Sequence, residues 1–177
     1  MTSPVRSPGT CDAVPGPETL SPPRDGVGYA AGVGDDFDER AIFVQGPAVI
    51  FRWRNAEGWP VEYASPNVLE VFGHSADDFI SGRVPYGTVL HPDDAARVAS
   101  EVAVATATGV VTFAHERYRI LHKDGSARWL YDYTRVLRDD AGAATHYLGY
   151  VLDITDRVIA EDDARELLAH VLASAGA

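Results

Sequence analysis

The chain has little cysteine and little positive charge. Its 177 residues include a single cysteine, Cys11, which excludes an internal disulfide framework and a cysteine-based zinc site. Asp and Glu outnumber Lys and Arg by 26 to 15, giving a formal net charge of −11. Nucleic-acid-binding surfaces need clustered basic residues, so this charge argues against nucleic acid as a partner.

Long apolar segments are also missing. No apolar run approaches the roughly 20 residues that a membrane-spanning helix needs, and the N-terminus lacks the apolar core of a signal peptide. We therefore expect no membrane partner and a cytoplasmic location. Apolar residues still make up 46% of the chain, which is long enough to bury a core, so we expect a globular domain.

The chain divides into three parts by composition. Residues 1–39 hold six of the eleven prolines and few periodic apolar residues, which predicts a disordered Pro/Gly-rich tail. Residues 40–155 carry the strand and helix patterns of a domain. From residue 156 to 177 the apolar period becomes helical.

Residues 116–155 are the most informative stretch of the domain. Three runs rich in Tyr, Trp, Val, Ile and Leu are separated by turn sequences at Lys123–Ser126 and Asp139–Gly142. This pattern predicts an antiparallel meander. Two shorter strands are expected upstream at 48–54 and 60–64, followed by short helices and a longer Ala/Val-rich helix that Gly109 ends.

The last 22 residues predict an amphipathic helix. Ala160, Ala164, Leu167 and Val171 are spaced 4, 3 and 4 apart, with charged residues opposite. Such a stripe needs a cover, either the domain's own sheet, a second protomer or a downstream domain. Capping of the sheet and homodimer formation are both open alternatives.

The order of these elements resembles the PAS sensory domain. The resemblance rests on the Lys123-Asp124-Gly125 turn, the His91–Asp94 helix start and the Asp153-Ile154-Thr155 end of the last strand. It implies an α+β fold in which a five-stranded antiparallel sheet carries short helices over one face, plus a C-terminal amphipathic helix. The space between sheet and helices would be the ligand pocket, and residues 153–155 would transmit the signal.

Strand alternation assigns side chains to the two faces of the sheet. The resemblance places one set in the ligand pocket: Phe72, Phe79, Tyr86, Leu90, Tyr118, Ile120, Leu130, Asp132, Thr134 and Val151. The opposite set, Trp129, Tyr131 and Tyr133, would face outward and need a cover. Together with Leu167 and Val171 these residues are the predicted interface.

Asp132 is the unusual member of the pocket set, because a buried carboxylate is costly unless it is paired. One interpretation is a structural salt bridge with Arg52, Arg54 or Arg119. The alternative is that Asp132 contacts a polar or cationic ligand.

No cofactor or metal follows from the sequence. In the flavin-binding LOV subgroup a cysteine forms a photoadduct, and Pro85 stands at the corresponding position here, so adduct chemistry is excluded. Non-covalent flavin and haem stay open as alternatives. The histidines lack a metal-ligand spacing, and we expect no metal site.

No catalytic motif is present, so we expect no enzymatic activity. The hypothesis is a signal-transduction module, the N-terminal sensor of a histidine kinase of a two-component system or of a cyclic-dinucleotide protein. It would bind a small-molecule ligand or a partner and act on a kinase or cyclase output domain. The alternative is a ligand-free PAS fold, filled by its own aromatic side chains, that serves as a dimerisation module or stand-alone adaptor.

Overall fold

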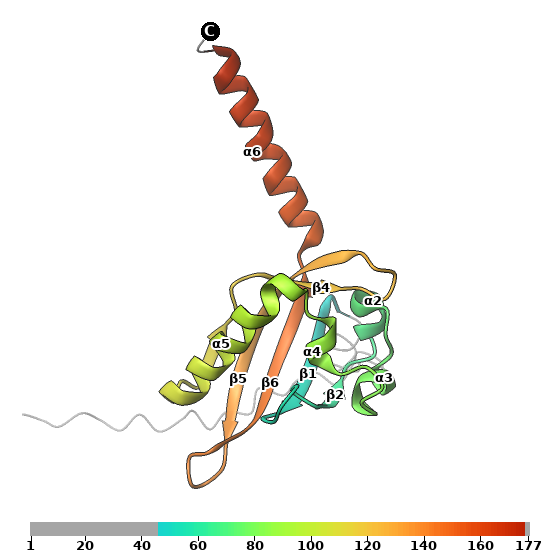
Figure 1. Ribbon diagram of the computed structural model, residues 1–177, viewed down its shortest axis with the longest axis vertical. Helices are drawn as coiled ribbons and strands as arrows, with labels where there is room; N and C mark the ends of the chain where they lie inside the picture. The colour runs from blue at the N-terminus through green and yellow to red at the C-terminus, as the bar shows by residue number, and fades with distance from the viewer. Residues whose placement is uncertain (1–45, 176–177) are drawn as a thin grey trace, which may run out of the picture. The chain divides into compact units, whose positions relative to one another are not determined.

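The computed structural model describes residues 46–175, so the predicted tail at 1–39 lies outside the described residues. Within this range six strands form one antiparallel sheet (Figure 1), namely β1 (Ala48–Arg54), β2 (Val61–Ala64), β3 (Thr112–Ala114), β4 (Tyr118–Leu121), β5 (Ala127–Arg138) and β6 (Ala144–Asp153). The strand order is β2-β1-β6-β5-β3, and β4 also pairs with β5.

The strands β3 and β4 share one position in the sheet. Thr112 pairs with Arg135 near one end of β5, whereas Tyr118 pairs with Leu130 near the other. A break at residues 115–117 separates the two strands. The sheet therefore has five positions filled by six strands, and the predicted antiparallel meander is confirmed.

Four helices lie over one face of the sheet (Figure 1): α2 (Val68–Phe72), α3 (Ala76–Ile80), α4 (Tyr86–Val89) and α5 (Pro92–Thr108). Their ends follow local sequence signals. Ser75 and Asp78 form a reciprocal capping box at the start of α3. Pro92 occupies the first turn of α5, and Gly109 ends that helix with a φ of 76°.

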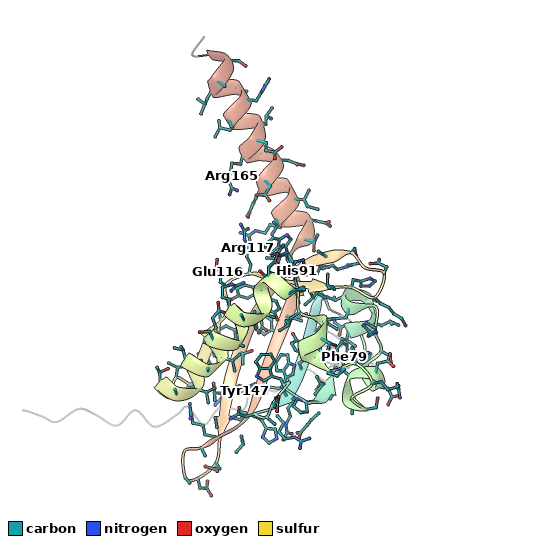
Figure 2. All side chains as sticks on the ribbon, viewed as in Figure 1. Phe79, His91, Glu116, Arg117, Tyr147 and Arg165 are labelled. Carbon is teal, nitrogen blue, oxygen red and sulfur yellow. The ribbon has the colours of Figure 1, made fainter. Side chains whose placement is uncertain are left out.

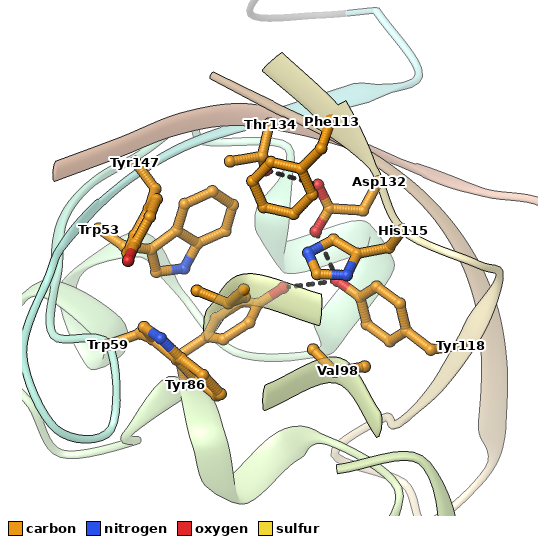
Figure 3. Close-up of a pocket in the computed structure, with 11 residues that line it drawn as sticks. Trp53, Trp59, Tyr86, Val98, Phe113, His115, Tyr118, Asp132, Thr134 and Tyr147 are labelled. Atoms are coloured by element: carbon orange, nitrogen blue, oxygen red, sulfur yellow. Dashed lines mark hydrogen bonds between the residues drawn. The ribbon is translucent and has the colours of Figure 1, made fainter. Parts of the chain in front are cut away.

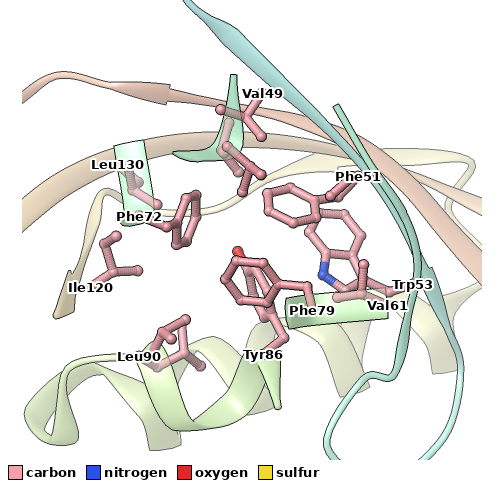
Figure 4. Packing of buried hydrophobic residues seen from close by; sticks show 14 of the residues in the cluster. Val49, Phe51, Trp53, Val61, Phe72, Phe79, Tyr86, Leu90, Ile120 and Leu130 are labelled. Atoms are coloured by element: carbon pink, nitrogen blue, oxygen red, sulfur yellow. The ribbon is translucent and has the colours of Figure 1, made fainter. Parts of the chain in front are cut away.

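Aromatic side chains fill much of the space between the helices and the sheet (Figure 4). Phe51 on β1 meets Phe72, Phe79 and Tyr86 edge to face, with ring centroids 5.3 to 5.8 Å apart. Each such pair contributes about 0.5–1.5 kcal/mol beyond the area it buries. The core is therefore densest beneath α2, α3 and α4.

The opposite face of the sheet is uncovered in the described structure. Tyr133, Leu148 and Tyr150 point outward and are 36%, 40% and 37% exposed. Their rings and methyl groups form an apolar surface over β5 and β6, bordered by Arg135. This is the face for which the sequence predicts a cover.

The last helix, α6 (Thr155–Ala175), follows β6 after a single residue. Val158 is buried, but every described side chain from Ile159 to Ser174 is exposed. The helix therefore does not cover the outer face of the sheet, and its apolar stripe is free. None of the helices described between residues 46 and 175 combines the length and apolar character that a membrane span demands.

Candidate functional site

A cavity of about 30 Å³ lies between the sheet and the helices (Figure 3). Both the sheet and the helices contribute side chains to its walls. The lining residues are Trp53, Trp59, Tyr86, Val98, Val102, Phe113, His115, Tyr118, Asp132, Thr134 and Tyr147. A water molecule occupies about 10–15 Å³ on this measure. The cavity thus has room for about two waters in the present conformation.

The predicted pocket residues divide between this cavity and the solid core. Tyr86, Tyr118, Asp132 and Thr134 line the cavity. The other six are packed in the hydrophobic core away from it, and these are Phe72, Phe79, Leu90, Ile120, Leu130 and Val151. A role in ligand contact stays a prediction for the four residues that line the cavity. The other six belong to the hydrophobic core and do not line it.

Asp132 is the polar centre of the site. Its side chain is 3% exposed and accepts two hydroxyl hydrogen bonds, one from Tyr118 at 2.8 Å and one from Thr134 at 2.9 Å. Thr134 lies two residues along the same strand, where alternation returns the side chain to the same face. The inner face of β5 therefore presents a carboxylate that hydroxyl groups hold in place.

The predicted salt bridge of Asp132 is wrong. Arg52 and Arg54 pair with Glu62 at 3.4 and 3.3 Å. Arg119 pairs with Asp94 at 2.9 Å, on the outside of the α5 start. These arginines alternate to the outer side of their strands, so they cannot reach the cavity.

Burial raises the pKa of Asp132 above its ordinary value of 3.8. The electrostatic effect of the nearby His115 and the hydroxyl donors of Tyr118 and Thr134 lower this pKa but do not outweigh burial. The same burial raises the pKa of the Tyr86 and Tyr118 hydroxyls, so both stay protonated at neutral pH.

The two tyrosines and Asp132 form a directed chain of hydrogen bonds. Tyr118 has one hydroxyl proton, and it goes to the carboxylate of Asp132. The Tyr86 hydroxyl lies 3.1 Å from the Tyr118 hydroxyl and must therefore donate to it. The oxygen of Tyr86 is left with a lone pair as the end of the chain.

Trp53 carries a polar group without a partner. Its indole Nε1 is buried and has no hydrogen-bond acceptor among the residues that the structure describes. The side chain is 4% exposed and lies across the cavity from Asp132 (Figure 3). A buried N–H donor without an acceptor lowers the folding stability by about 1–3 kcal/mol. An acceptor bound next to Trp53 Nε1 would remove this cost.

Trp59 stands beside Trp53 in an unusual backbone conformation. It lies in the connection between β1 and β2 and has a φ of 49°, in the left-handed region. A bulky residue is rare there, and such strain of about 1–3 kcal/mol is found where a function needs the geometry. Here the geometry places a half-exposed indole on the cavity wall.

His115 closes the cavity on the side of α5. It occupies the break between β3 and β4, and its Nδ1 lies 2.6 Å from a carboxylate oxygen of Glu101. Glu101 also pairs with Arg97 at 2.6 Å. This side of the cavity is thus anchored by a charged network that continues to the surface of α5.

Sequence reasoning missed seven of the lining residues. Alternation on β1 and β6 could have found Trp53 and Tyr147, which share the inner face with Val49 and Val151. A four-residue spacing on α5 could have found Val98 and Val102. The other three, Trp59, Phe113 and His115, depend on a strained turn and a strand break for which the sequence has no clear signal.

The cavity does not fit a large cofactor. Sites for drug-sized ligands are typically about 300–1,000 Å³, and this cavity is about 30 Å³. Flavin or haem would require the aromatic core to rearrange. Within residues 46–175 no three His, Cys, Asp or Glu side chains lie close enough together to hold a metal ion.

The junction between β6 and α6 is fixed by its own set of contacts. The Asp153 carboxylate accepts from the Thr155 backbone N–H at 2.9 Å and from the Thr155 hydroxyl at 2.5 Å, and it pairs with Arg128 at 2.9 Å. Thr155 in turn accepts from the backbone N–H of Trp129 at 2.9 Å. The start of α6 is therefore tied to the start of β5.

The ionic state of Asp153 favours this arrangement. Burial raises the pKa of Asp153, but the donors of Thr155 and the charge of Arg128 outweigh it, and the net pKa lies below 3.8. The carboxylate is therefore ionised at neutral pH, as an ion pair and helix-start acceptor requires.

A second connection to α6 runs through Trp129. The guanidinium groups of Arg117 and Arg119 lie 5.6 and 5.3 Å from its ring centroid. Arg117 also pairs with Glu161 on α6 at 3.2 Å, near the base of that helix (Figure 2). Trp129, a predicted interface residue, thus contacts two cations in this structure.

Known proteins match this architecture. The family described as the PAS fold matches residues 61–151. A methyl sulfide methyltransferase-associated sensor of Methanosarcina acetivorans is 40% identical over 123 residues, which is 70% of this chain. The chain spans only 12% of the length of that relative.

Solved structures agree on the fold. The N-terminal domain of a diguanylate cyclase with a PAS/PAC sensor from Marinobacter aquaeolei is 25% identical, with a TM-score of 0.53 over 62% of this chain and 97% of that one. A sensory box histidine kinase/response regulator from Burkholderia thailandensis is 24% identical, with a TM-score of 0.59 over 75% and 95% of the two chains.

Proposed function

The chain belongs to the PAS family, and on that basis we propose that it is a sensory module with a small-ligand cavity and an output helix. The ligand would bind at the cavity around Asp132. The change would pass through Asp153, Ile154 and Thr155 into α6.

The observation that carries this proposal is the strand register between cavity and junction. On β5 and β6, Asp132 pairs with Val151, and Leu130 pairs with Asp153. The pair that contains the buried carboxylate and the pair that contains Asp153 are therefore only two positions apart along β5 and β6. A shift of β5 against β6 at Asp132 would move Trp129 and the junction hydrogen bonds with it.

The output proposed for α6 is a signalling domain beyond the described residues. The relative from Methanosarcina acetivorans is a sensor, and the similar Marinobacter domain belongs to a diguanylate cyclase. A histidine kinase or a cyclic-dinucleotide enzyme would use α6 in the same way, as a rigid lever joined to β6.

The test of transmission is the substitution Asp153→Ala, followed by amide hydrogen exchange. We expect the domain to stay folded, at a cost of about 1–3 kcal/mol for the lost hydrogen bonds and ion pair. Amides in the first turn of α6 should exchange faster, whereas those of β5 and β6 keep their protection. Arg128→Gln is the matched control, because it removes the ion pair and keeps the two Thr155 bonds. Global unfolding of the Asp153 variant would contradict a transmission role.

The test of ligand binding is native mass spectrometry with an absorbance spectrum on freshly purified protein. Extra mass or a chromophore would identify a bound molecule directly. A bare mass excludes a tightly bound ligand, and it favours the second candidate function, a ligand-free dimerisation module, only if added small molecules also leave the cavity unaffected.

That second candidate is supported by exposed apolar surface. Leu167 and Val171 on α6 are 66% and 52% exposed, and Tyr133 on the outer sheet face is 36% exposed. A homodimer would bury one or both surfaces. The aromatic packing of Phe51, Phe72 and Phe79 fits this candidate as well, because it leaves little empty volume.

A further inference from the structure

We propose that the cavity binds a small uncharged molecule of about three heavy atoms with one hydroxyl-like group, the chemistry of a short-chain alcohol. The inference rests on the proposed sensory function and specifies the ligand class. It follows from the volume of the cavity, the placement of its polar atoms and the two hydroxyl groups that already donate to Asp132.

The volume sets the size of the ligand. Room for about two waters corresponds to a chain of about three heavy atoms. Aromatic rings close the cavity on several sides, including Trp53, Tyr86 and Tyr147. Growth by many atoms would force these rings out of the core packing, which is costly in a close-packed interior.

The polar atoms set the functional group. The Trp53 Nε1 group offers a hydrogen-bond donor without an acceptor. The neighbouring Tyr86 side chain, with its ring centroid 5.2 Å from that of Trp53, carries the oxygen that ends the chain through Tyr118 to Asp132. A ligand hydroxyl group can satisfy both positions, because its oxygen can accept a hydrogen bond from Trp53 Nε1 and its proton can be donated to the Tyr86 oxygen.

The charge balance argues against an ionic ligand. An anion would lose its hydration in an enclosed, mostly apolar cavity, where the Trp53 Nε1 group is the donor without a partner among the described residues. A cation would compete with Tyr118 and Thr134, which already donate to the two oxygens of Asp132. An uncharged ligand leaves this arrangement intact.

The remaining walls suit a short alkyl group. Val98 and Val102 on α5 and Phe113 on β3 face the cavity with apolar atoms only. An alkyl group buried there gains about 0.8 kcal/mol per methylene group relative to water. Water makes no favourable apolar contact with these side chains, so the geometry favours a molecule with an apolar end.

Trp59 offers an access route. Its indole is half-exposed on the cavity wall, and its strained backbone belongs to the β1–β2 connection. Relaxation of that turn would move the ring without disturbing the strand pairing of β1 with β6. Ligand exchange can then occur without opening the core.

The test is an NMR titration of the ¹⁵N,¹³C-labelled full chain with ethanol, ethylammonium and acetate. The three tryptophan indole N–H signals (Trp53, Trp59 and Trp129) serve as reporters and are assigned with single Trp→Phe variants. Ethanol should shift the Trp53 signal saturably, with an affinity no tighter than about millimolar for so small a ligand. The Trp129 signal should stay unchanged, because its ring lies between Arg117 and Arg119 and not at the cavity.

The matched variants locate the contact. Trp53→Phe keeps the aromatic ring and removes the donor, so ethanol affinity read from the Val98 and Val102 methyl signals should fall roughly 3- to 10-fold. Trp129→Phe should leave that affinity unchanged. Equal loss in both variants would overturn the proposed contact.

The outcomes separate the ligand class from the sensory function. Equal or tighter binding of ethylammonium or acetate would refute the uncharged class and leave a sensory cavity standing. A Trp53 signal that none of the three probes shifts, with water as the only occupant, would also refute it. The sensory function fails on different evidence, namely the unfolding of the Asp153→Ala variant.

Discussion

At the scale of single residues, the inner face of β5 shows how a buried carboxylate is tolerated without a salt bridge to any residue between 46 and 175. Asp132 receives one hydroxyl on each oxygen, and Tyr86 extends the chain by one more hydrogen bond. Hydrogen bonds of this kind offset part of the desolvation penalty but not all of it. The remaining penalty is why burial raises the pKa of Asp132.

Gly149 is a second residue whose identity the site depends on. A Cβ at this position would lie 2.6 Å from the Thr134 hydroxyl, 2.8 Å from the Tyr133 carbonyl oxygen and 3.2 Å from Trp53. Contacts under 3.0 Å with backbone force a shift of the strand. Trp53 and Thr134 therefore reach their positions because residue 149 has no side chain.

We expect Gly149→Ala to destabilise the domain by about 1–3 kcal/mol, through overpacking against β5. Urea unfolding monitored by circular dichroism measures this change. Gly87→Ala is the control, because its Cβ would meet nothing closer than 3.9 Å and a helix favours alanine. Similar midpoints for the two variants would show that β5 and β6 separate more easily than the contacts imply.

The sequence predicted the position of a side chain correctly where strand alternation decides which side chains share a face. Alternation put Leu130, Asp132 and Thr134 on one face of β5, the resemblance to PAS domains assigned that face to the inside, and all three residues are buried. The interpretation that paired Asp132 with an arginine is wrong, because Arg52, Arg54 and Arg119 lie on the outer side of their strands and pair with Glu62 or Asp94. Alternation could not find Trp59, whose place follows from one backbone angle in a turn.

At the scale of elements, the order of strands and helices was predictable and the detail of the sheet edge was not. The turn at Gly125 and the helix end at Gly109 have direct sequence signals, and both glycines have positive φ. No signal separates β3 from β4, because the break at residues 115–117 contains no glycine or proline. That break is what brings His115 to the cavity.

The helix α6 is amphipathic over only part of its length. Ala160, Ala164, Leu167 and Val171 share one side, but Arg157 and Glu161 lie on or near the same side in the first two turns. These two residues pair with each other at 2.8 Å, and Glu161 also contacts Arg117. The base of the helix is thus bound to its own domain, and the later turns are free for a partner.

If α6 forms a dimer seam, the double substitution Leu167→Asp and Val171→Asp should convert the protein to a monomer. Two carboxylates in an apolar seam would lose hydration without gaining partners, which costs several kcal/mol. Sedimentation velocity of the full chain measures the result. Ala169→Asp with Ala173→Asp is the control, with the same spacing and charge on the opposite side. An unchanged mass in the first variant would place the interface elsewhere.

At the scale of the whole molecule, two apolar surfaces are uncovered in the described structure, one on α6 and one on the outer face of the sheet. Tyr133 and Tyr150 stack on the sheet with centroids 5.7 Å apart, and Leu148 extends the same patch. Contiguous patches of this kind mark interaction surfaces on soluble proteins. If the Leu167→Asp, Val171→Asp variant still sediments as a dimer, the sheet face is the stronger contact.

The charged groups of the whole molecule also set the dependence of its stability on pH. Asp94 and Asp153 have pKa values lowered in the folded state, so the stability they contribute is present above 3.8 and is lost as pH falls through their folded values. Asp132 acts with the opposite sign. Its folded pKa is raised, so stability falls as pH rises from 3.8 through that folded value.

The variant Asp132→Asn isolates this opposing contribution from the rest of the molecule. We expect the free energy of unfolding of the wild type, relative to the variant, to decrease as pH rises above 3.8 and to level off above the folded pKa of Asp132. Urea unfolding of both proteins between pH 4 and 8 gives the difference. The change in net charge is nearly shared by the two proteins and therefore cancels. A flat difference would mean that the Asp132 carboxylate is as well stabilised inside the cavity as in water, which would contradict the desolvation cost inferred from its burial.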